Sequence, residues 1–272
     1  MPNILDKIIA HKKLEINQQK AHLKLDEFNG SITPGDGSFL RAMQKPGLKI
    51  IAEIKPKSPS AGTLCQDLRL DEIVPIYNKY ACAISVLTDK KYFGGGLELL
   101  SQVKEQSDLP LLCKDFILDP YQCYLARKHG AQAVLLIVKI LAPENLNELY
   151  QRINNLGMTA VVEIQNKQEL ERAMALQPVP AVILINNRNL KDFQISFDTT
   201  KTLSQLITKQ TIVISASGVQ SKSHIDELLS FCSTFLIGSH FMRSANLDTE
   251  LQALTQRNLS LSSGNVQRGG KQ

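Results

Sequence analysis

The chain has 272 residues, of which 43% are hydrophobic and 21% are charged, with 15 glycines and 11 prolines. This balance is typical of a globular protein and excludes disordered and fibrous classes. No apolar run reaches the ~18 residues that cross a bilayer, and charged side chains interrupt residues 1–13. We therefore expect no membrane span, no secretory leader and a cytoplasmic location.

The net charge of +5 is concentrated at the two ends of the sequence. Residues 1–24 contribute +3 and residues 257–272 contribute another +3, which leaves about −1 for everything between them. A surface that follows nucleic-acid phosphates needs its basic residues gathered on one folded face. The charge pattern therefore predicts no nucleic-acid partner.

The five cysteines are odd in number and form no CxxC pair, so they predict reduced thiols rather than a disulfide framework or a zinc site. The five histidines are scattered, and no cluster offers three convergent metal ligands. We expect no bound metal.

The N-terminal segment is predicted to be a helical extension of the main fold. Apolar residues recur at helical spacing between Ile4 and about Leu25, and a linker with glycine and proline follows at 30–37. A short helix is expected around 39–43. Residues 1–46 are thus interpreted as a lid-like extension.

Eight short apolar runs then recur about every 25 residues, and stretches with helical spacing separate them. This repeat predicts a (β/α)₈ barrel over residues 47–255, an α/β fold that typically needs ~250 residues. The sequence contains no GxGxxG motif, so it does not favour an open dinucleotide-binding sheet. The eight runs are 48–54, 81–87, 109–113, 131–138, 158–164, 181–185, 211–214 and 235–238.

The polar residues 256–272 are predicted to be a disordered tail.

Charged side chains fall near the carboxyl ends of several predicted strands, where barrels of this kind carry their sites. Residues two apart share one face of a strand, so Glu53 and Lys55 face the same way. The same rule pairs Lys114 with Leu112, Glu163 with Val161 and Asn186 with Leu184. Lysines and carboxylates facing one desolvated cavity suit general acid–base chemistry.

Glycine-containing turns follow the last two predicted strands, where barrels commonly bind phosphate. The residues concerned are Ser217, Gly218, Gly238 and Ser239. After the second and third strands, Phe93 and Phe116 could line a flat apolar pocket for an aromatic ring. From these residues alone we predict an acid–base enzyme for a phosphorylated small molecule.

Five segments of the sequence form a recognisable set of motifs: IAEIKPKSPSAG at 51–62, ISVLTD with YFGG at 84–95, LCKDFI at 112–117, VEI at 162–164 and INNRNL at 185–190. Together they closely resemble the motifs of the indole-3-glycerol phosphate synthase family. The resemblance extends from about Ile4 to Leu247, and we expect no second fused barrel of the kind found in some family members.

The resemblance implies a cofactor-free ring closure of 1-(2-carboxyphenylamino)-1-deoxyribulose 5-phosphate, with loss of carbon dioxide and water, in tryptophan biosynthesis. We expect the protein to be a monomer. The resemblance also implies that Lys114 is the general acid that protonates the ribulose carbonyl, and that Glu163, helped by Glu53, serves in dehydration. Lys55 would pair with anionic groups of the substrate, and Asn186 would help to position it.

The same resemblance assigns the remaining binding residues. Arg188 positions the substrate together with Asn186. The anthranilate pocket is formed by Ser58, Phe93, Phe116 and Leu135. The phosphate is held by Ser217, Gly218, Gly238 and Ser239.

Two positions depart from the family pattern. At the end of the seventh predicted strand, the family usually has Ser-Glu-Ser-Gly. This sequence has Ser-Ala-Ser-Gly there, with Ala216 in place of the glutamate. Leu184 stands where the family usually has a glycine, and the period-2 rule turns it inward beside Ala216. The changes are interpreted as drift in a functional enzyme, and the alternative is a weakened or repurposed paralogue.

Two further classes of protein fit the sequence less well. A non-catalytic protein that binds a phosphorylated ligand would keep the phosphate turns but have no use for Lys114 and Glu163. A phosphosugar isomerase on the same barrel would lack the KPKSP segment at 55–59.

Overall fold

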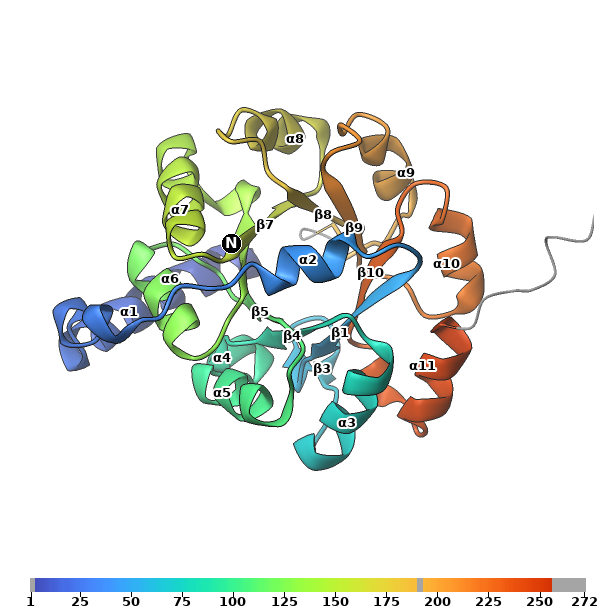
Figure 1. Cartoon of the computed structure of the whole chain (residues 1–272), viewed down its shortest axis with the longest axis horizontal. Coiled ribbons are helices and arrows are strands. Elements are labelled where there is room, and N and C mark those ends of the chain that lie inside the picture. Colours follow the sequence, from blue (N-terminus) through green and yellow to red (C-terminus); the bar gives the residue numbers. More distant parts are fainter. Residues whose placement is uncertain (1–2, 190–192, 256–272) are drawn as a thin grey trace, which may run out of the picture.

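Eight parallel strands close into a barrel surrounded by helices in the computed structural model, which describes residues 3–189 and 193–255 (Figure 1). Each predicted apolar run coincides with one strand, and the boundaries differ by two residues at most. The (β/α)₈ prediction is confirmed, and the predicted tail at 256–272 lies outside the described residues. In chain order the barrel strands are β1 (Lys49–Ile54), β4 (Ala83–Leu87), β5 (Leu111–Lys114), β6 (Ala133–Ile137), β7 (Thr159–Ile164), β8 (Val182–Asn186), β9 (Ile212–Ala216) and β10 (Thr234–Ile237).

The barrel closes because β1 pairs with both β4 and β10. A two-stranded hairpin of β2 (Lys57–Ser58) and β3 (Gly62–Thr63) follows β1 directly. The helices that follow the strands are α3 (Leu70–Tyr80), α4 (Lys90–Phe93), α5 (Leu97–Gln106), α6 (Pro120–Lys128), α7 (Pro143–Asn155), α8 (Lys167–Met174), α9 (Asp198–Ser204), α10 (Lys222–Leu228) and α11 (Leu247–Thr255). Short 3₁₀ turns are found at η1 (Leu25–Glu27), η2 (Asn29–Ser31), η3 (Val138–Ile140) and η4 (Phe241–Arg243).

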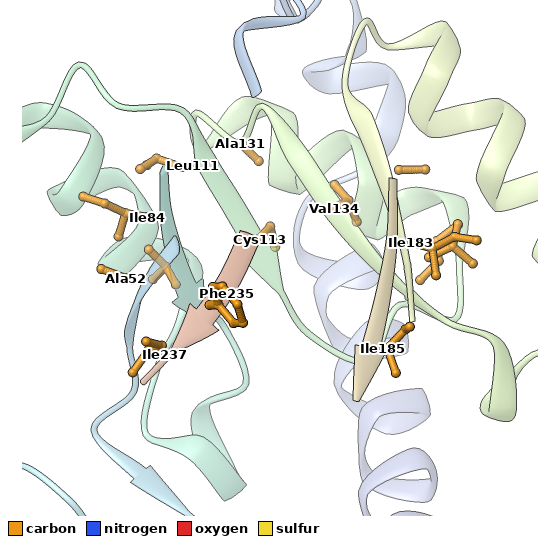
Figure 2. Packing of buried hydrophobic residues seen from close by; sticks show 14 of the residues in the cluster. Ala52, Ile84, Leu111, Cys113, Ala131, Val134, Ile183, Ile185, Phe235 and Ile237 are labelled. Carbon is orange, nitrogen blue, oxygen red and sulfur yellow. The ribbon is translucent and has the colours of Figure 1, made fainter. Parts of the chain in front are cut away.

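Alternation along the strands divides the core into two layers. In β1, Ile50, Ala52 and Ile54 belong to a cluster packed between the strands and the surrounding helices. Ile51 belongs to a second cluster, which fills the barrel interior. Figure 2 shows part of the outer cluster, with Phe235 and Ile237 of β10 among its members. Side chains two apart therefore share a face, as period 2 requires.

The N-terminal extension consists of α1 (Ile4–His22) and α2 (Ser38–Gln44). The first helix begins with a capping box between Asn3 and Asp6, and it ends three residues before the predicted boundary. The second lies across the centre of the ring of helices in Figure 1, and its buried Phe39, Ala42 and Met43 join the interior cluster. The extension is thus packed on the barrel rather than attached by a loose linker.

Burial along α1 differs from the apolar pattern in one respect. Leu14 is 61% exposed, whereas Lys12 is 1% exposed.

Among the described residues, no helix is both long enough and apolar enough to cross a membrane.

Candidate active site

One cavity at the carboxyl ends of the barrel strands brings together nearly all of the predicted site residues. It is lined by Glu53, Lys55, Ser58, Phe93, Lys114, Phe116, Glu163, Asn186, Arg188, Ser217, Gly218, Gly238 and Ser239. These residues come from the ends of seven barrel strands or the loops beyond them. The barrel therefore gathers residues that are up to 186 positions apart in the chain.

Leu135 is the one predicted binding residue that does not line this cavity. Its side chain is 1% exposed and lies in the interior cluster of the barrel. Ile137, two residues further along β6 on the same face, lines the cavity instead. The cavity lies at the carboxyl end of β6, so Ile137 reaches it, whereas Leu135 lies deeper inside the barrel.

The centre of the cavity is a buried carboxylate held between two lysines. Glu53 is 1% exposed, and its Oε1 lies 2.7 Å from Lys55 Nζ. Lys114 Nζ lies 3.7 Å from Glu53 Oε2. Burial alone would raise the pKa of the Glu53 carboxyl, but the ammonium groups of Lys55 and Lys114 outweigh it and lower that pKa below its ordinary value. Glu53 is therefore ionised at neutral pH.

A second buried carboxylate, Glu163, has a different environment. It is 3% exposed and accepts a hydrogen bond of 3.1 Å from Asn186 Nδ2. Burial raises the pKa of the Glu163 carboxyl above its ordinary value, although Lys114 and the Asn186 hydrogen bond oppose the rise. Asn186 is oriented in turn by the Arg188 backbone N–H, which donates to its Oδ1 at 3.0 Å. The pKa values of the two carboxyl groups thus shift in opposite directions within one cavity. This arrangement is suited to distinct proton-transfer roles.

The aromatic wall of the cavity is formed by Phe93 and Phe116, whose ring centroids lie 5.9 Å apart. Phe93 ends the short helix α4, and Phe116 follows β5. Ile4, Leu5 and Ile8 of α1 also line the cavity. The predicted lid-like extension therefore supplies apolar side chains to the same space.

The loop after β9 is strained and tightly anchored. Ser217 has a φ of 68° and Gly218 a φ of 95°, and a Cβ at Gly218 would lie 2.6 Å from the Ile195 side chain. Asn187 Nδ2 donates to Ser215 Oγ at 3.0 Å and to the Ser217 carbonyl at 3.2 Å. This buried network holds the loop after β9 against the end of β8.

Gly238, directly after β10, is required by Glu53. A Cβ at position 238 would lie 2.3 Å from Glu53 Oε1 and 2.9 Å from Glu53 Cβ. A contact under 3 Å cannot be accommodated without moving the carboxylate or the strand end. The sequence indicated Gly238 as part of a phosphate turn, but it contains no signal for this contact, because the two residues are 185 positions apart.

Both departures from the family pattern lie inside the barrel, as the period-2 rule predicted for Leu184. Leu184 and Ala216 belong to the interior cluster, and Ala216 pairs in register with Asn186. Ala216 lines the cavity, whereas Leu184 is completely buried below it.

Several lining residues were not identified from the sequence. Phe193, Gln220 and His240 come from loops after β8, β9 and β10. Their positions in irregular segments leave no periodic signal, although each follows a predicted strand. Within the described residues, no group of three or more His, Cys, Asp or Glu side chains could hold a metal ion. All five cysteines are free.

The fold and this cavity define a class: a (β/α)₈-barrel protein with a buried acid–base cluster between an aromatic wall and two glycine-containing loops. Comparison with known proteins gives the family. The sequence profile of the family described as "Indole-3-glycerol phosphate synthase" matches residues 5–254. The chain therefore belongs to the indole-3-glycerol phosphate synthase family.

Curated relatives agree with this assignment. The "Indole-3-glycerol phosphate synthase" of Trichodesmium erythraeum is 39% identical over 269 residues, with 95% of this chain and 90% of that protein covered. The "Tryptophan biosynthesis protein TrpCF" of Vibrio cholerae is 41% identical over 254 residues, which cover 93% of this chain and 54% of that protein. The chain spans about half the length of such TrpCF relatives.

A solved structure supports the fold alone. The 3-hexulose-6-phosphate synthase of Salmonella typhimurium superimposes with a TM-score of 0.61 at 15% identity, covering 76% of this chain and 97% of that one. At this identity the likeness extends to the barrel architecture and carries no information on the reaction.

The contact between Gly238 and Glu53 generates a stability prediction. Gly238→Ala should lower the free energy of unfolding by about 1–3 kcal/mol, because overpacking displaces the carboxylate from its two lysines. Gly30→Ala is the matched control, since a Cβ there meets nothing within 4 Å. It should stay within about 0.5 kcal/mol of the wild type. Urea unfolding measures both variants, and equal stability for the two would contradict the contact.

Proposed function

We propose that this protein is an indole-3-glycerol phosphate synthase of tryptophan biosynthesis, a carboxy-lyase. Its substrate would be 1-(2-carboxyphenylamino)-1-deoxy-D-ribulose 5-phosphate, and its products indole-3-glycerol phosphate, carbon dioxide and water. The observation that carries the proposal is the convergence of Lys114, Glu53 and Glu163 on one cavity in a chain of this family. The reaction as proposed needs neither metal nor organic cofactor.

In the proposed first stage, Lys114 protonates the ribulose carbonyl oxygen while the ring carbon that bears the carboxylate attacks the carbonyl carbon. Glu53 supports this role, because its ionised carboxylate holds the Lys114 ammonium at 3.7 Å. The new carbon–carbon bond forms before carbon dioxide leaves, and the electron pair of the broken bond restores the aromatic ring. Lys55 would pair with an anionic group of the substrate.

In the proposed second stage, the hydroxyl left by the former carbonyl takes up a proton and departs as water. The neighbouring CH2 carbon, which bears the nitrogen, loses a proton, and the electron pair of that C–H bond forms the carbon–carbon double bond of the indole ring. Glu163 is suited to take part in these proton transfers, because burial raises the pKa of its carboxyl. Asn186 would hold Glu163 and the substrate together, since its amide donates to Glu163 and its oxygen is fixed by Arg188. Arg188 would position the substrate from the edge of the cavity.

The proposed binding mode divides the substrate between two ends of the cavity. The anthranilate ring would lie against Phe93 and Phe116, with Ser58 beside it, and Leu135 would support this pocket from below. The phosphate would lie among the backbone N–H groups and hydroxyls of Ser217, Gly218, Gly238 and Ser239. Family membership, 39% identity to a protein named indole-3-glycerol phosphate synthase and 41% identity to a protein named for tryptophan biosynthesis do not favour the alternative of a repurposed paralogue. We further propose that the protein acts as a monomer in the cytoplasm.

The role of Lys114 gives the central test of this proposal. Lys114→Met should lower kcat by roughly 10²–10⁴-fold, because a general acid contributes about that much. Lys209→Met, at an exposed lysine remote from the cavity, is the control and should keep wild-type kcat. Product formation is followed by indole absorbance, and folding by thermal unfolding. A well-folded Lys114→Met protein with more than about a tenth of wild-type kcat would contradict the role.

The phosphate site generates a second prediction. Inorganic phosphate should compete with substrate, and Ser239→Asp should raise KM strongly, because its carboxylate repels the phosphate at close range. This position is preferable to Gly238, where any side chain collides with Glu53. Ser230→Asp adds the same charge at an exposed position outside the cavity and should leave KM unchanged. An unchanged KM in Ser239→Asp would place the phosphate elsewhere.

The carboxylate that is missing at the end of β9, where Ala216 stands, generates a third prediction. We expect the wild type to turn over at an ordinary rate of ~1–10 per second, and Ala216→Glu with Leu184→Gly to be no faster. Leu184→Gly empties buried volume, so the pair should lose about 2–5 kcal/mol of stability, and kcat is measured well below the unfolding midpoint. A stably folded double variant about tenfold faster than the wild type would instead show that Ala216 marks a weakened enzyme.

A further inference from the structure

The N-terminal helix carries a lysine that is buried more completely than any lysine of the cavity. Lys12 is 1% exposed, and its Nζ lies 2.9 Å from Asp115 Oδ1 and 3.0 Å from both Asp89 Oδ2 and Glu15 Oε2. Burial lowers the pKa of the ammonium, but the carboxylates of Asp115, Asp89 and Glu15 outweigh this and raise it above the ordinary value. Lys12 therefore stays charged, and its ion pairs join α1 to two loops of the barrel.

The two aspartates that Lys12 contacts also fix the backbone of the aromatic wall. Asp89 follows β4 and caps α4, accepting a hydrogen bond of 2.7 Å from the Tyr92 backbone N–H, one residue before Phe93. Asp115 accepts a hydrogen bond of 2.7 Å from the backbone N–H of Phe116. Thr88 Oγ1 donates to Asp115 at 2.8 Å and connects the two loops.

Lys12 also lies close to the part of α1 that lines the cavity. It lies one helical turn after Ile8 on the same face, and Ile4, Leu5 and Ile8 line the cavity. One ammonium group therefore links the apolar side chains of the helix with both phenylalanines. The mechanism proposed above makes no use of Lys12, which does not line the cavity.

We propose that Lys12 is a positioning residue that acts through Asp89 and Asp115. It holds Phe93, Phe116 and the start of α1 in the arrangement that receives the aromatic half of the substrate. The inference rests on the proposed function, because it assumes that this wall receives an anthranilate ring. It does not concern the phosphate end, which is formed by loops after β9 and β10.

The chain offers a matched control on the same helix. Lys20 Nζ lies 2.6 Å from Asp119 Oδ2, and Asp119 caps α6 as Asp89 caps α4. This pair is exposed, at 42% for the lysine and 30% for the aspartate, and neither residue lines the cavity. Exposed ion pairs contribute little to the stability of a folded protein. Lys20→Met thus removes a helix-to-cap ion pair without disturbing the aromatic wall.

The test compares Lys12→Met, Lys12→Arg and Lys20→Met with the wild type. Two probes are used: the non-cyclising analogue in which the ribulose carbonyl is reduced to an alcohol, and inorganic phosphate. Anthranilate fluorescence reports binding of the analogue without a protein background from tryptophan, since the chain has none. Phosphate affinity is obtained from its competition with the analogue.

In Lys12→Met, the Kd of the analogue should rise at least about tenfold, because small displacements of positioning groups are costly. The phosphate affinity should stay within about twofold, and Lys12→Arg should recover part of the analogue affinity, because it restores the positive charge. Lys20→Met should match the wild type with both probes. A purely structural role would weaken both probes together, so that result would overturn the proposal. Equal analogue affinities in Lys12→Met and Lys20→Met would also overturn it.

Lys12→Met leaves buried carboxylates without their cation, so a second variant guards against misfolding. In Lys12→Met with Asp115→Asn, the asparagine keeps an oxygen for the Phe116 N–H while one negative charge is removed. This double variant should fold and still bind the analogue at least about tenfold more weakly. Wild-type affinity in the folded double variant would contradict the inference. A wild type that binds no analogue would instead refute the proposed function, and the inference with it.

Discussion

The ion pairs of Glu53 are the interaction on which the rest of the site depends. A carboxylate that is 1% exposed is tolerated inside a barrel only if cations compensate for its lost hydration. Lys55 from the end of β1 and Lys114 from the end of β5 supply that compensation. The same carboxylate requires that Gly238 has no side chain, so a third strand end, β10, is adapted to it.

A consequence of this arrangement is that two buried glutamates in one cavity acquire different properties. Glu53 has two ammonium neighbours that outweigh its burial and lower its pKa, whereas burial raises the pKa of Glu163 because Lys114 and the Asn186 amide do not outweigh it. The Lys114 ammonium acts on both carboxyls and lowers the pKa of each. One cavity can therefore hold a fixed negative charge for orienting a cation and a separate group for carrying a proton. Both needs arise in a reaction that combines ring closure with dehydration.

Much of this arrangement could be predicted from the sequence, because it depends on regular strands. Period 2 correctly predicted that Leu184 faces the barrel interior, and the strand repeat predicted all eight strands. What could not be predicted depends on contacts between distant elements. Lys12 occurs in a helix whose apolar positions suggested ordinary packing, and only the fold brings Asp89 and Asp115 to it.

The limits of the sequence pattern are equally clear at the edge of the cavity. Leu135 and Ile137 share one face of β6, and periodicity alone does not tell which of them is the last inward residue. The Phe193 side chain reaches the cavity from an irregular loop with a φ of 61°, for which no periodic signal exists. Regular elements thus specify the direction of a side chain, while its depth and its partners depend on the closed barrel.

The opposite pKa shifts of the two buried glutamates, lowered for Glu53 and raised for Glu163, can be measured directly by carbon-13 NMR. The side-chain carboxyl carbons of glutamate are labelled in the ligand-free protein and titrated with pH, with Glu53→Gln and Glu163→Gln used to assign the two signals. Glu163 should titrate above the ordinary glutamate pKa of about 4.3, and Glu53 should titrate below it. A Glu163 signal that titrates at or below that value, or a Glu53 signal above it, would show that the two carboxyls do not have the distinct roles described here.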